Sequence, residues 1–436
     1  MATAFPGMGG FYRGPTVTPR LDPLPVPRYK PAAMSSTQNS PTGALADLRV
    51  LELGTLIAGP FCGQLLGDMG AEVIKIEAPG QGDPMRHWGP QKRGTPSVWW
   101  PVIGRNKKAI TLDLRQTDGQ RLFKDLCRTS DVVIENFRPG TLEKWNCGWA
   151  ELSALNPKLI LVRVSGYGQT GPYSQRAGYG GIGEAMGGLR YIVGEPDRPP
   201  SRVGISIGDS LAAVHACMGT LAALHHRERT GMGQVVDAAI YESVLSMMES
   251  LVTEYDQLGH VRERSGPILP RIAPSNVYPT RDGIVMIGAN QDTVFARLGE
   301  AMGSPALAQD PRFRDHTARG EHQQELDTLI AAWTATLGTR ELLDRLEKFG
   351  IPSGLIYRTA DMLEDPHFRA REAIVTTRHP VFGQLRMQNV APRLSASPGS
   401  VRTPAPELGQ HNDEIYGGLL KLDTAEREAL RTRGII

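Results

Sequence analysis

The sequence predicts an α/β protein with a Rossmann-like large domain and a smaller α+β domain. Short apolar segments alternate with helical stretches through the first half of the chain, which is typical of a parallel sheet built from β-α units. A turn-rich segment follows, and a strand and several helices come after it. The 436 residues are enough for two domains with sizeable cores.

Five buried strands are expected in the first half of the chain. Each is an apolar run that ends in glycine or polar residues, and a stretch with helical spacing follows the first run after Pro60. The expected strands are Leu48–Gly54, Ala71–Glu77, Lys108–Leu114, Asp131–Phe137 and Leu159–Gly168. Sheets of this kind bind ligands beyond the carboxyl ends of their strands, so the loops there are the first candidates for a site.

A long apolar helix is expected to open at Asp209 and to end near Arg229. After it, residues 233–240 fit either a strand or the entry to a helix. Residues 241–252 have helical spacing and are expected to form one further helix.

The domain boundaries follow changes in composition. Residues 1–45 are rich in Pro, Gly, Ser and Thr and show no lasting period, which predicts a disordered N-terminal extension. A targeting role and a true start at Met34 are the alternatives for this segment. The other predicted ranges are a large domain at 46–250 and 376–436, a linker at 251–269 and a small α+β domain at 270–375.

The charge balance gives no sign of a nucleic-acid or membrane partner. Lys and Arg number 48 against 46 Asp and Glu, and no apolar run approaches the roughly 20 residues of a membrane span. The 4 cysteines form no CxxC pair and fit a reducing, cytoplasmic location. The histidines do not cluster at ligand spacing, so we expect no metal. The glycine-rich segment 179–188 follows no buried strand, which disfavours a phosphate cradle.

Asp209 is the residue singled out for chemistry. An Asp at the start of a helix is most often an N-cap. The same position would keep its carboxylate ionised through the helix dipole, and the small neighbours Gly208 and Ser210 leave room for a ligand. An ionised, accessible carboxylate can act as a nucleophile in acyl transfer. Local pattern alone leaves both interpretations open.

Seven separated segments occur in the order typical of one enzyme family. They are LRVLELGTLIAGPFCGQLLGDMGAEVIKIEAPGQGDPMR, NKKAITLDL, VVIENFRPGTLEKW, VSGYGQTGPY, GDSLAA, RTGMGQVVDAAIYESVL and ELGQHNDEI. From about Leu48 to its C-terminus the chain closely resembles the class III CoA-transferases of the CaiB/BaiF type, which are relatives of formyl-CoA transferase and of α-methylacyl-CoA racemase.

The resemblance implies an assembly and a mechanism. Each monomer would be an open ring, and two rings would interlock into a homodimer. Asp209 would attack the acyl-CoA thioester, giving an acyl-aspartyl anhydride and then an aspartyl-CoA thioester. Coenzyme A would take part as a thioester substrate, with no tightly bound cofactor.

The resemblance also implies contacts with CoA. Asn136 and Phe137 would lie beside its adenosine part, and Leu114 would pack on the adenine. Lys144 matches a basic position near the phosphates. The further candidates are Arg86, Arg105 and Tyr179. Without the resemblance, the apolar residues are equally consistent with ordinary packing and the basic ones with solvated surface charge.

Three positions depart from patterns in the family. Many relatives carry an acid where this chain has Gly180, and Glu184 is a nearby substitute. Formyl-CoA transferase has Gln where this chain has Ile57, which disfavours formyl and oxalyl substrates. The racemases carry His at the position of Tyr179, and Tyr, with a pKa near 10, is a poor acid/base at neutral pH.

The sequence therefore predicts a CoA-transferase that moves CoA from an acyl-CoA such as succinyl-CoA to a small carboxylic acid. Resemblance within the family favours a dicarboxylate such as malate, citramalate, itaconate or mesaconate, and several arginines could hold a second carboxylate. These arginines are Arg176, Arg202, Arg264 and Arg271. The alternatives are a 2-methylacyl-CoA racemase and a CoA-binding subunit of a hetero-oligomeric transferase.

Overall fold

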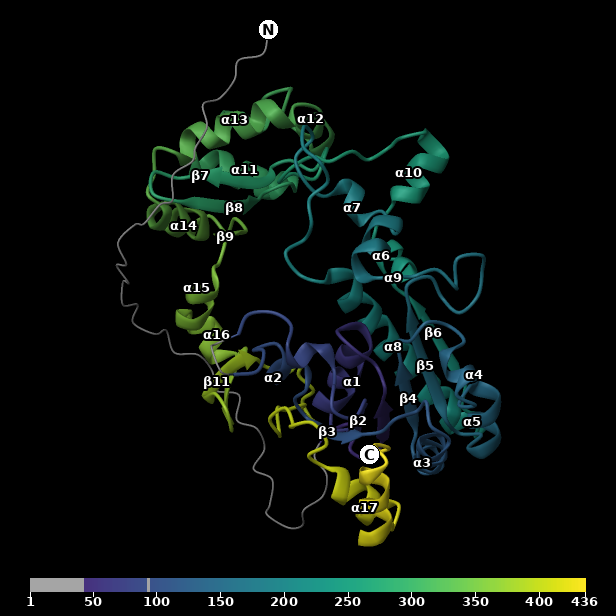
Figure 1. Ribbon diagram of the computed structural model, residues 1–436. Coiled ribbons are helices and arrows are strands. Elements are labelled where there is room, and N and C mark those ends of the chain that lie inside the picture. The colour runs from purple at the N-terminus through teal and green to yellow at the C-terminus, as the bar shows by residue number, and fades with distance from the viewer. Residues whose placement is uncertain (1–42, 92–94) are drawn as a thin grey trace. The chain divides into compact units, whose positions relative to one another are not determined.

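A six-stranded parallel sheet organises the large domain of the computed structural model, which describes residues 43–91 and 95–436 (Figure 1). The strands are β1 (Arg49–Glu52), β2 (Glu72–Glu77), β3 (Lys107–Thr111), β4 (Val132–Glu135), β5 (Ile160–Ser165) and β6 (Val235–Ala239). Their order is β3-β2-β1-β4-β5-β6, so the chain reverses direction across the sheet between β1 and β4. This order confirms the predicted Rossmann-like α/β fold.

The sheet is buried on both faces, which explains why its strands read as continuous apolar runs. Leu51 lies in one apolar cluster with Phe123 of helix α3 (Thr117–Cys127). Its neighbour Val50 lies in a second cluster with Leu66 of α1 (Ala58–Asp68) and Ala212 of α8 (Ile207–Thr230). Successive side chains of a strand point to opposite faces, so each strand supplies both clusters.

Helices fill the connections between these strands and follow the last one. They are α1 (Ala58–Asp68), α2 (Trp100–Ile103), α3 (Thr117–Cys127), α4 (Thr141–Lys144), α5 (Trp149–Leu155), α6 (Gly180–Met186), α7 (Leu189–Ile192), α8 (Ile207–Thr230), α9 (Ile240–Leu245) and α10 (Leu251–Leu258). A short 3₁₀ turn spans Pro84–Arg86.

One expectation for this region needs correction. The single helix predicted at 241–252 is interrupted, because α9 ends at Leu245 and Glu249 adopts a left-handed backbone with φ 51° before α10 begins. Helix α10 also occupies part of the segment predicted as a linker. Residues 233–240, left open between strand and helix entry, contain β6 and the first residue of α9.

Helix α8 is long and apolar enough, by length and composition, to cross a membrane. In this fold it packs against α1 and strands β5 and β6 and is part of the core. Its remaining apolar side chains, Val214, Met218 and Leu221, are exposed and recur every three or four residues, so they share one face of the helix.

The glycine-rich segment 179–188 forms α6 rather than a phosphate cradle. A Cβ at Gly183 would lie 2.4 Å from Ile240 Cγ2, and one at Gly187 would lie 2.7 Å from Val244 Cβ. The glycines therefore allow the backbone of α6 to approach α9 closely.

A second apolar core lies in the range predicted as the small domain. It contains the antiparallel strands β7 (Ser275–Pro279), β8 (Ile284–Gly288) and β9 (Ser353–Leu355), with helices α11 (Asp292–Ala301), α12 (His316–Glu321), α13 (Gln323–Thr334) and α14 (Thr339–Lys348). A 3₁₀ turn spans Pro305–Gln309. Phe295, Phe313 and Ile330 are buried together in this core. The predicted limits of the domains stay predictions.

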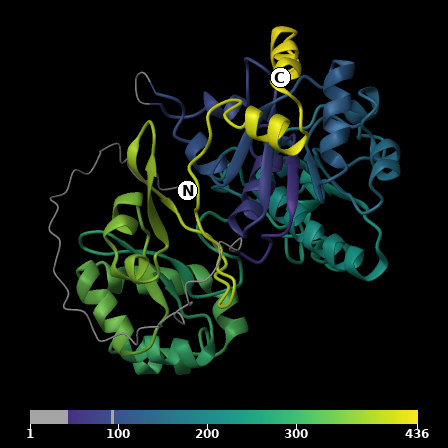
Figure 2. The same ribbon diagram turned by 90° about the horizontal axis from the view of Figure 1, so that it is seen from below.

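The C-terminal part returns to the edge of the large sheet. Helices α15 (Thr359–Glu364) and α16 (Pro366–Ala370) lead to the hairpin β10 (Ile374–His379) and β11 (Gly383–Gln388), and a π-helix (Asp413–Leu419) and α17 (Thr424–Thr432) end the chain. The Thr111 N–H of β3 donates to Asn412 Oδ1 over 2.9 Å. Figure 2 shows the yellow C-terminal helices beside the strands of the large domain.

Most of the predicted N-terminal extension, residues 1–42, lies outside the described residues. Within the last three residues of that prediction, the Leu45 N–H donates to Met69 O over 3.0 Å. The described fold therefore begins a few residues before the first strand expected at Leu48.

Candidate active site

A cavity of about 240 Å³ lies beyond the carboxyl ends of β1, β4 and β5, where the fold predicts a ligand. Its walls come from residues 55–58 after β1, Asn136 after β4, the end of β5 with Ser165 and Gly166, and the first turn of α8 with Asp209. The loops that the sequence indicated as candidates thus meet around the residue that it singled out for chemistry.

Asp209 is not the N-cap of its helix. Ser206 occupies that position, and Asp209 is the third residue of α8, with its side chain lining the cavity. Within the described part of the chain, its carboxylate accepts no hydrogen bond, so the capping interpretation is wrong. The carboxylate is free to meet a ligand.

Gly180 faces the Asp209 carboxylate. A Cβ built on Gly180 would lie 2.2 Å from Asp209 Oδ2, which is far inside van der Waals contact. Gly208, next to Asp209, is also close-packed, since a Cβ there would lie 2.9 Å from Gly180 O. The missing side chain at Gly180 leaves the space for the Asp209 carboxylate, and the missing side chain at Gly208 lets the start of α8 pack closely on α6.

The pKa of Asp209 is raised to about 6. Burial is the largest cause, the negative charge of Glu184 adds to it, and the positive charge of Arg202 opposes it. The expectation of a permanently ionised carboxylate therefore needs correction, because burial outweighs the helix dipole. Asp209 is still mainly ionised at neutral pH, and its higher basicity makes it a better nucleophile than an ordinary aspartate.

Glu184 is the acid that the sequence offered as a substitute for the one missing at Gly180. It is 1% exposed and forms an ion pair with Arg190 at 2.9 Å. Its Oε1 accepts a hydrogen bond from the Gly208 N–H at 3.3 Å. Glu184 thus holds the first turn of α8 and acts on the Asp209 carboxylate through its charge.

The floor of the cavity is the loop between β1 and α1. Asn136 fixes Thr55 by two reciprocal hydrogen bonds of 2.8 Å, accepting from the Thr55 N–H and donating to the Thr55 carbonyl. Leu56 adopts a left-handed backbone with φ 64°, and its N–H donates to Asp83 Oδ1 at 3.1 Å. Asn136, predicted to contact CoA, therefore shapes the cavity as well as lining it.

A buried cluster of charges supports this loop from below. Lys75 of β2 donates to Glu52 Oε1 and to Asp83 Oδ2, each at 2.8 Å, and also to the carbonyl of Gly54. Lys107 of β3 donates to Glu52 Oε2 at 2.5 Å. These four charged side chains are fully buried. No local pattern in the sequence indicates this cluster, because Lys75 lies inside an apolar strand and its partners come from other segments.

The other predicted CoA contacts lie at the same end of the sheet or in its core. Tyr179 lines the cavity and is 52% exposed. Phe137 packs on Trp145 with ring centroids 5.3 Å apart, and Lys144 is exposed at the end of α4. Leu114 is buried in the apolar cluster against which Phe137 packs. A CoA role for these residues stays a prediction.

Arg86 and Arg105 are not surface cations. Arg86 pairs with Glu77 at 2.6 Å and lies over the Trp100 ring at 3.9 Å. Arg105 is 2% exposed and pairs with Asp68 at 2.6 Å. Their guanidinium groups are engaged inside the protein, which assigns them to packing rather than to phosphate binding in this structure.

Of the four arginines proposed to hold a second carboxylate, Arg202 lines the cavity. Arg176 stacks on Tyr173 with its guanidinium carbon 3.6 Å from the ring centroid. Arg264 donates to the carbonyl of Tyr191 at 3.1 Å. Arg271 lies before β7 with φ 66°. Neither Arg176, Arg264 nor Arg271 belongs to the lining of the cavity.

Three bulky side chains of the cavity were not anticipated. Met85, Trp88 and Trp99 line it from the segment between β2 and α2. Trp88 and Trp99 are 44% and 40% exposed. No local signal in the sequence distinguishes such residues from ordinary surface aromatics, because the fold alone brings their segment to the carboxyl end of β1.

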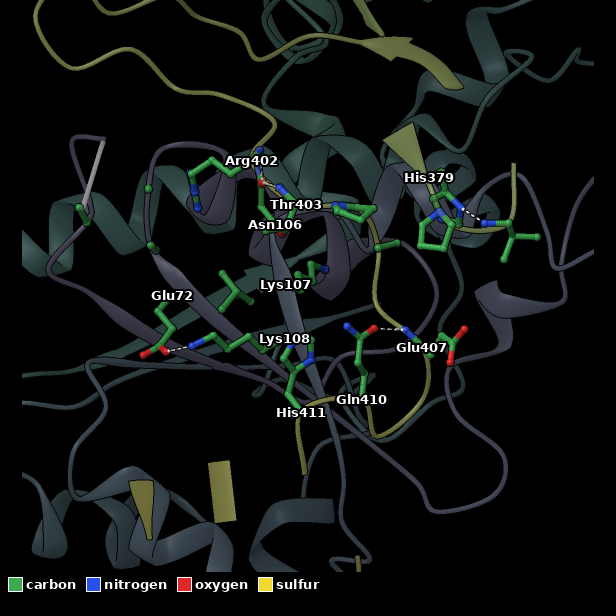
Figure 3. Close-up of a pocket in the computed structure, with 18 residues that line it drawn as sticks. Glu72, Asn106, Lys107, Lys108, His379, Arg402, Thr403, Glu407, Gln410 and His411 are labelled. Carbon is green, nitrogen blue, oxygen red and sulfur yellow. Dashed lines mark hydrogen bonds and ion pairs between the residues drawn. The ribbon is translucent and has the colours of Figure 1, made fainter. Parts of the chain in front are cut away.

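A larger cavity of about 790 Å³ lies elsewhere, at the amino ends of β2 and β3 (Figure 3). It is bounded by the strand starts, the hairpin turn at His379 and the C-terminal segment near His411. Lys108 there is already paired with Glu72 at 2.6 Å. The cavity shares no lining residue with the Asp209 cavity. Within residues 43–91 and 95–436, no group of three His, Cys, Asp or Glu side chains could hold a metal.

Comparison with known proteins points to one family. A family model described as CoA-transferase family III matches residues 45–412. The chain is 59% identical over 397 residues to succinyl-CoA–D-citramalate CoA-transferase of Chloroflexus aurantiacus, with 91% of this chain and 99% of that protein covered. It is 41% identical over 397 residues to the β subunit of succinyl-CoA–L-malate CoA-transferase of the same organism, covering 90% and 98%.

A solved structure agrees with the fold. The crystal structure of a CaiB/BaiF family protein from Brucella suis superposes with a TM-score of 0.76 at 34% identity, covering 87% of this chain and 100% of that one.

The space that Gly180 leaves for Asp209 can be tested by Gly180→Ala. The new methyl group must displace the Asp209 carboxylate, which is the mobile end of a side chain, so we expect little change in melting temperature. We expect CoA-transfer kcat to fall at least about tenfold, because a misplaced reacting group loses its alignment. Gly181→Ala is the control, since its Cβ would meet only Arg190 Nη2 at 3.6 Å. Equal activities of the two variants would contradict this account.

The raised pKa of Asp209 predicts the pH dependence of transfer. Of its two protonation states, the carboxylate is the one that can act as a nucleophile, so we expect kcat/KM to fall as the pH drops through about 6. Glu184→Gln removes a negative charge that raises this pKa, so the acidic limb should move to lower pH. Glu242→Gln makes the same change at an exposed residue of α9 and should leave the limb in place. If the acid-side fall in kcat/KM of Glu184→Gln occurs at the same pH as in the wild type, or at a higher pH, this fall does not report the pKa of Asp209.

Proposed function

The chain belongs to CoA-transferase family III, and from this premise we propose that it transfers CoA from succinyl-CoA to a small dicarboxylic acid of the citramalate or malate type. The observation that carries the proposal is the Asp209 carboxylate, which stands without a hydrogen-bond partner among the described residues in a cavity at the carboxyl ends of the strands. The acceptor class follows the two Chloroflexus relatives, which are named for D-citramalate and L-malate.

In the first half of the proposed reaction, an Asp209 carboxylate oxygen attacks the thioester carbonyl carbon of succinyl-CoA. The carbon–sulfur bond breaks, the CoA thiolate leaves, and a succinyl-aspartyl anhydride remains. The thiolate then attacks the Asp209 carbonyl carbon of this anhydride, which releases succinate and forms an aspartyl-CoA thioester. Both intermediates are activated acyl groups, so two accessible steps replace one difficult exchange.

In the second half, the acceptor carboxylate attacks the aspartyl-CoA thioester and expels the thiolate, giving a second mixed anhydride. The thiolate attacks the acceptor's carbonyl carbon, the new acyl-CoA forms, and the Asp209 carboxylate is restored. The apolar walls at Ile57, Met85 and Ile240 support this sequence, because limiting water protects an anhydride from hydrolysis.

The CoA moiety is proposed to extend from the cavity past Asn136 and Phe137 towards Lys144. Lys144 is exposed and has no ion-pair partner in the described part of the chain, so it can meet a phosphate. We propose a cytoplasmic location, consistent with the free thiols at Cys62, Cys127, Cys147 and Cys217. Tyr179 in place of the racemase histidine favours transfer over racemisation.

Asp209→Ala tests the proposed nucleophile. We expect this variant to lose transfer between succinyl-CoA and D-citramalate while its melting temperature stays near that of the wild type, because the carboxylate makes no hydrogen bond to the described residues. Incubating the wild type with succinyl-CoA and then hydroxylamine should convert Asp209 to a hydroxamate detectable by peptide mass. Ser210→Ala is a neighbouring control that should remain trappable. Substantial turnover by Asp209→Ala would refute the proposal.

We also propose that the chain is a homodimer of interlocked rings. Its support is apolar surface that one chain leaves uncovered: Met218 on α8 is 61% exposed, and Tyr255 and Leu258 on α10 are 64% and 77% exposed. Such surface is typical of an interface between subunits.

Light scattering after size exclusion should give twice the 47.5 kDa of one chain at micromolar concentration. Met218→Glu should shift this mass towards the monomer, since it introduces a charge into the proposed interface. Ala150→Glu places the same side chain on α5, which covers the opposite face of the sheet, and should leave the mass unchanged. A folded, active wild-type monomer would exclude this assembly.

A further inference from the structure

The Asp209 cavity contains a second charge that the mechanism above does not use. Among the described residues that line the cavity, Asp209 and Arg202 are the charged ones, and the others are apolar or neutral polar. Arg202 lowers the pKa of Asp209, against the opposing effects of burial and Glu184, so its charge acts within the site. The cavity therefore pairs one reacting carboxylate with one cation.

The guanidinium of Arg202 is available to a ligand. Its one hydrogen bond among the described residues runs from Nη2 to Ser206 Oγ at 3.2 Å, which ties it to the start of α8. No carboxylate lies within ion-pairing distance of it in residues 43–91 and 95–436. By contrast, the buried Arg86 and Arg105 are both paired with acids. An arginine left free beside a reacting group can bind an anion with two parallel hydrogen bonds.

We propose that Arg202 binds the second carboxylate of the acid whose first carboxyl group reacts with Asp209, and thereby selects dicarboxylates over monocarboxylates. This inference rests on the proposed function. Arg202 lies five residues before α8 and Asp209 lies in its first turn, and both line the same cavity without forming an ion pair with each other. The gap between them is where the short carbon chain of a dicarboxylate would lie.

The rest of the cavity makes this assignment specific. A carboxylate brought beside the side chains of Ile57, Met85 or Ile240 would lose hydration without gaining a partner, which is unfavourable. Beside Arg202 it gains a charge-assisted hydrogen bond. A monocarboxylate of equal length gains nothing from Arg202, so the guanidinium discriminates between the two classes.

Identity exchange isolates this effect, because donor and acceptor then carry the same acyl group. One assay follows ¹³C-succinate entering succinyl-CoA, and the other follows ¹³C-butyrate entering butyryl-CoA. We expect Arg202→Gln to lower kcat/KM for succinyl exchange about 10- to 100-fold, the range for a hydrogen bond between charged groups. Both assays are run at about pH 8, well above the pKa of Asp209, so that loss of the Arg202 charge leaves this carboxylate ionised. Butyryl exchange should then change less than about threefold. Arg202→Lys should recover part of the succinyl rate, because it restores the positive charge but not the two parallel N–H donors of a guanidinium group.

Arg176→Gln is the matched control, because Arg176 is an exposed arginine that stacks on Tyr173 outside the cavity lining. It should leave both exchanges unchanged. An Arg202→Gln variant that loses both exchanges equally, or neither, overturns the inference, as does a wild type that exchanges butyrate as efficiently as succinate. If the wild type exchanges neither acid, the proposed function fails first, so the two failures are distinguishable.

Discussion

The active site depends on the cluster of four buried charges formed by Glu52, Lys75, Asp83 and Lys107. Removing such ions from water is expensive, and the cluster is tolerable only because two cations meet two carboxylates and the remaining donors reach backbone carbonyls. Burial alone would lower the pKa of Lys75, but Glu52 and Asp83 raise it overall, so the ammonium group stays charged inside the sheet. Its partners are thereby fixed in position.

Asp83 connects this charge cluster to the residues that line the cavity. One oxygen of its carboxylate accepts from Lys75, and the other accepts from the N–H groups of Leu56 at 3.1 Å and Met85 at 2.9 Å. Leu56 and Met85 both line the cavity. The charges thus hold the left-handed turn at Leu56 that β1 needs to enter α1, and Asn136 holds Thr55 from the neighbouring strand. The loop between β1 and α1 is therefore held by buried charges that do not line the cavity and by Asn136, which does.

The parallel sheet could be predicted because burial on both faces leaves a simple mark, an apolar run ended by glycine or polar residues. The same apolar pattern gives no indication that Lys75, inside β2, is a buried charge. Its partner Asp83 is brought near by the loop after β2. Asp209 could be singled out from its position at the start of an apolar helix and from the family resemblance. The interpretation that it caps the helix was wrong, because Ser206 is the N-cap three residues earlier. Arg86 resembled a surface cation, because no local sequence pattern indicates that it pairs with Glu77 at the end of β2.

The electrostatics of Asp209 reflect a compromise between burial and basicity. A carboxylate in the first turn of a helix is normally stabilised by the dipole, by up to about 2 kcal/mol in partly buried sites. Here desolvation and the charge of Glu184 outweigh that effect. An acid placed directly at position 180 would collide with the carboxylate, whereas Glu184, one helical turn further on, raises its basicity without contact. With the acid one turn further on, the Asp209 carboxylate is more basic than an ordinary aspartate, mainly ionised at neutral pH and open to the cavity, as the proposed nucleophile requires.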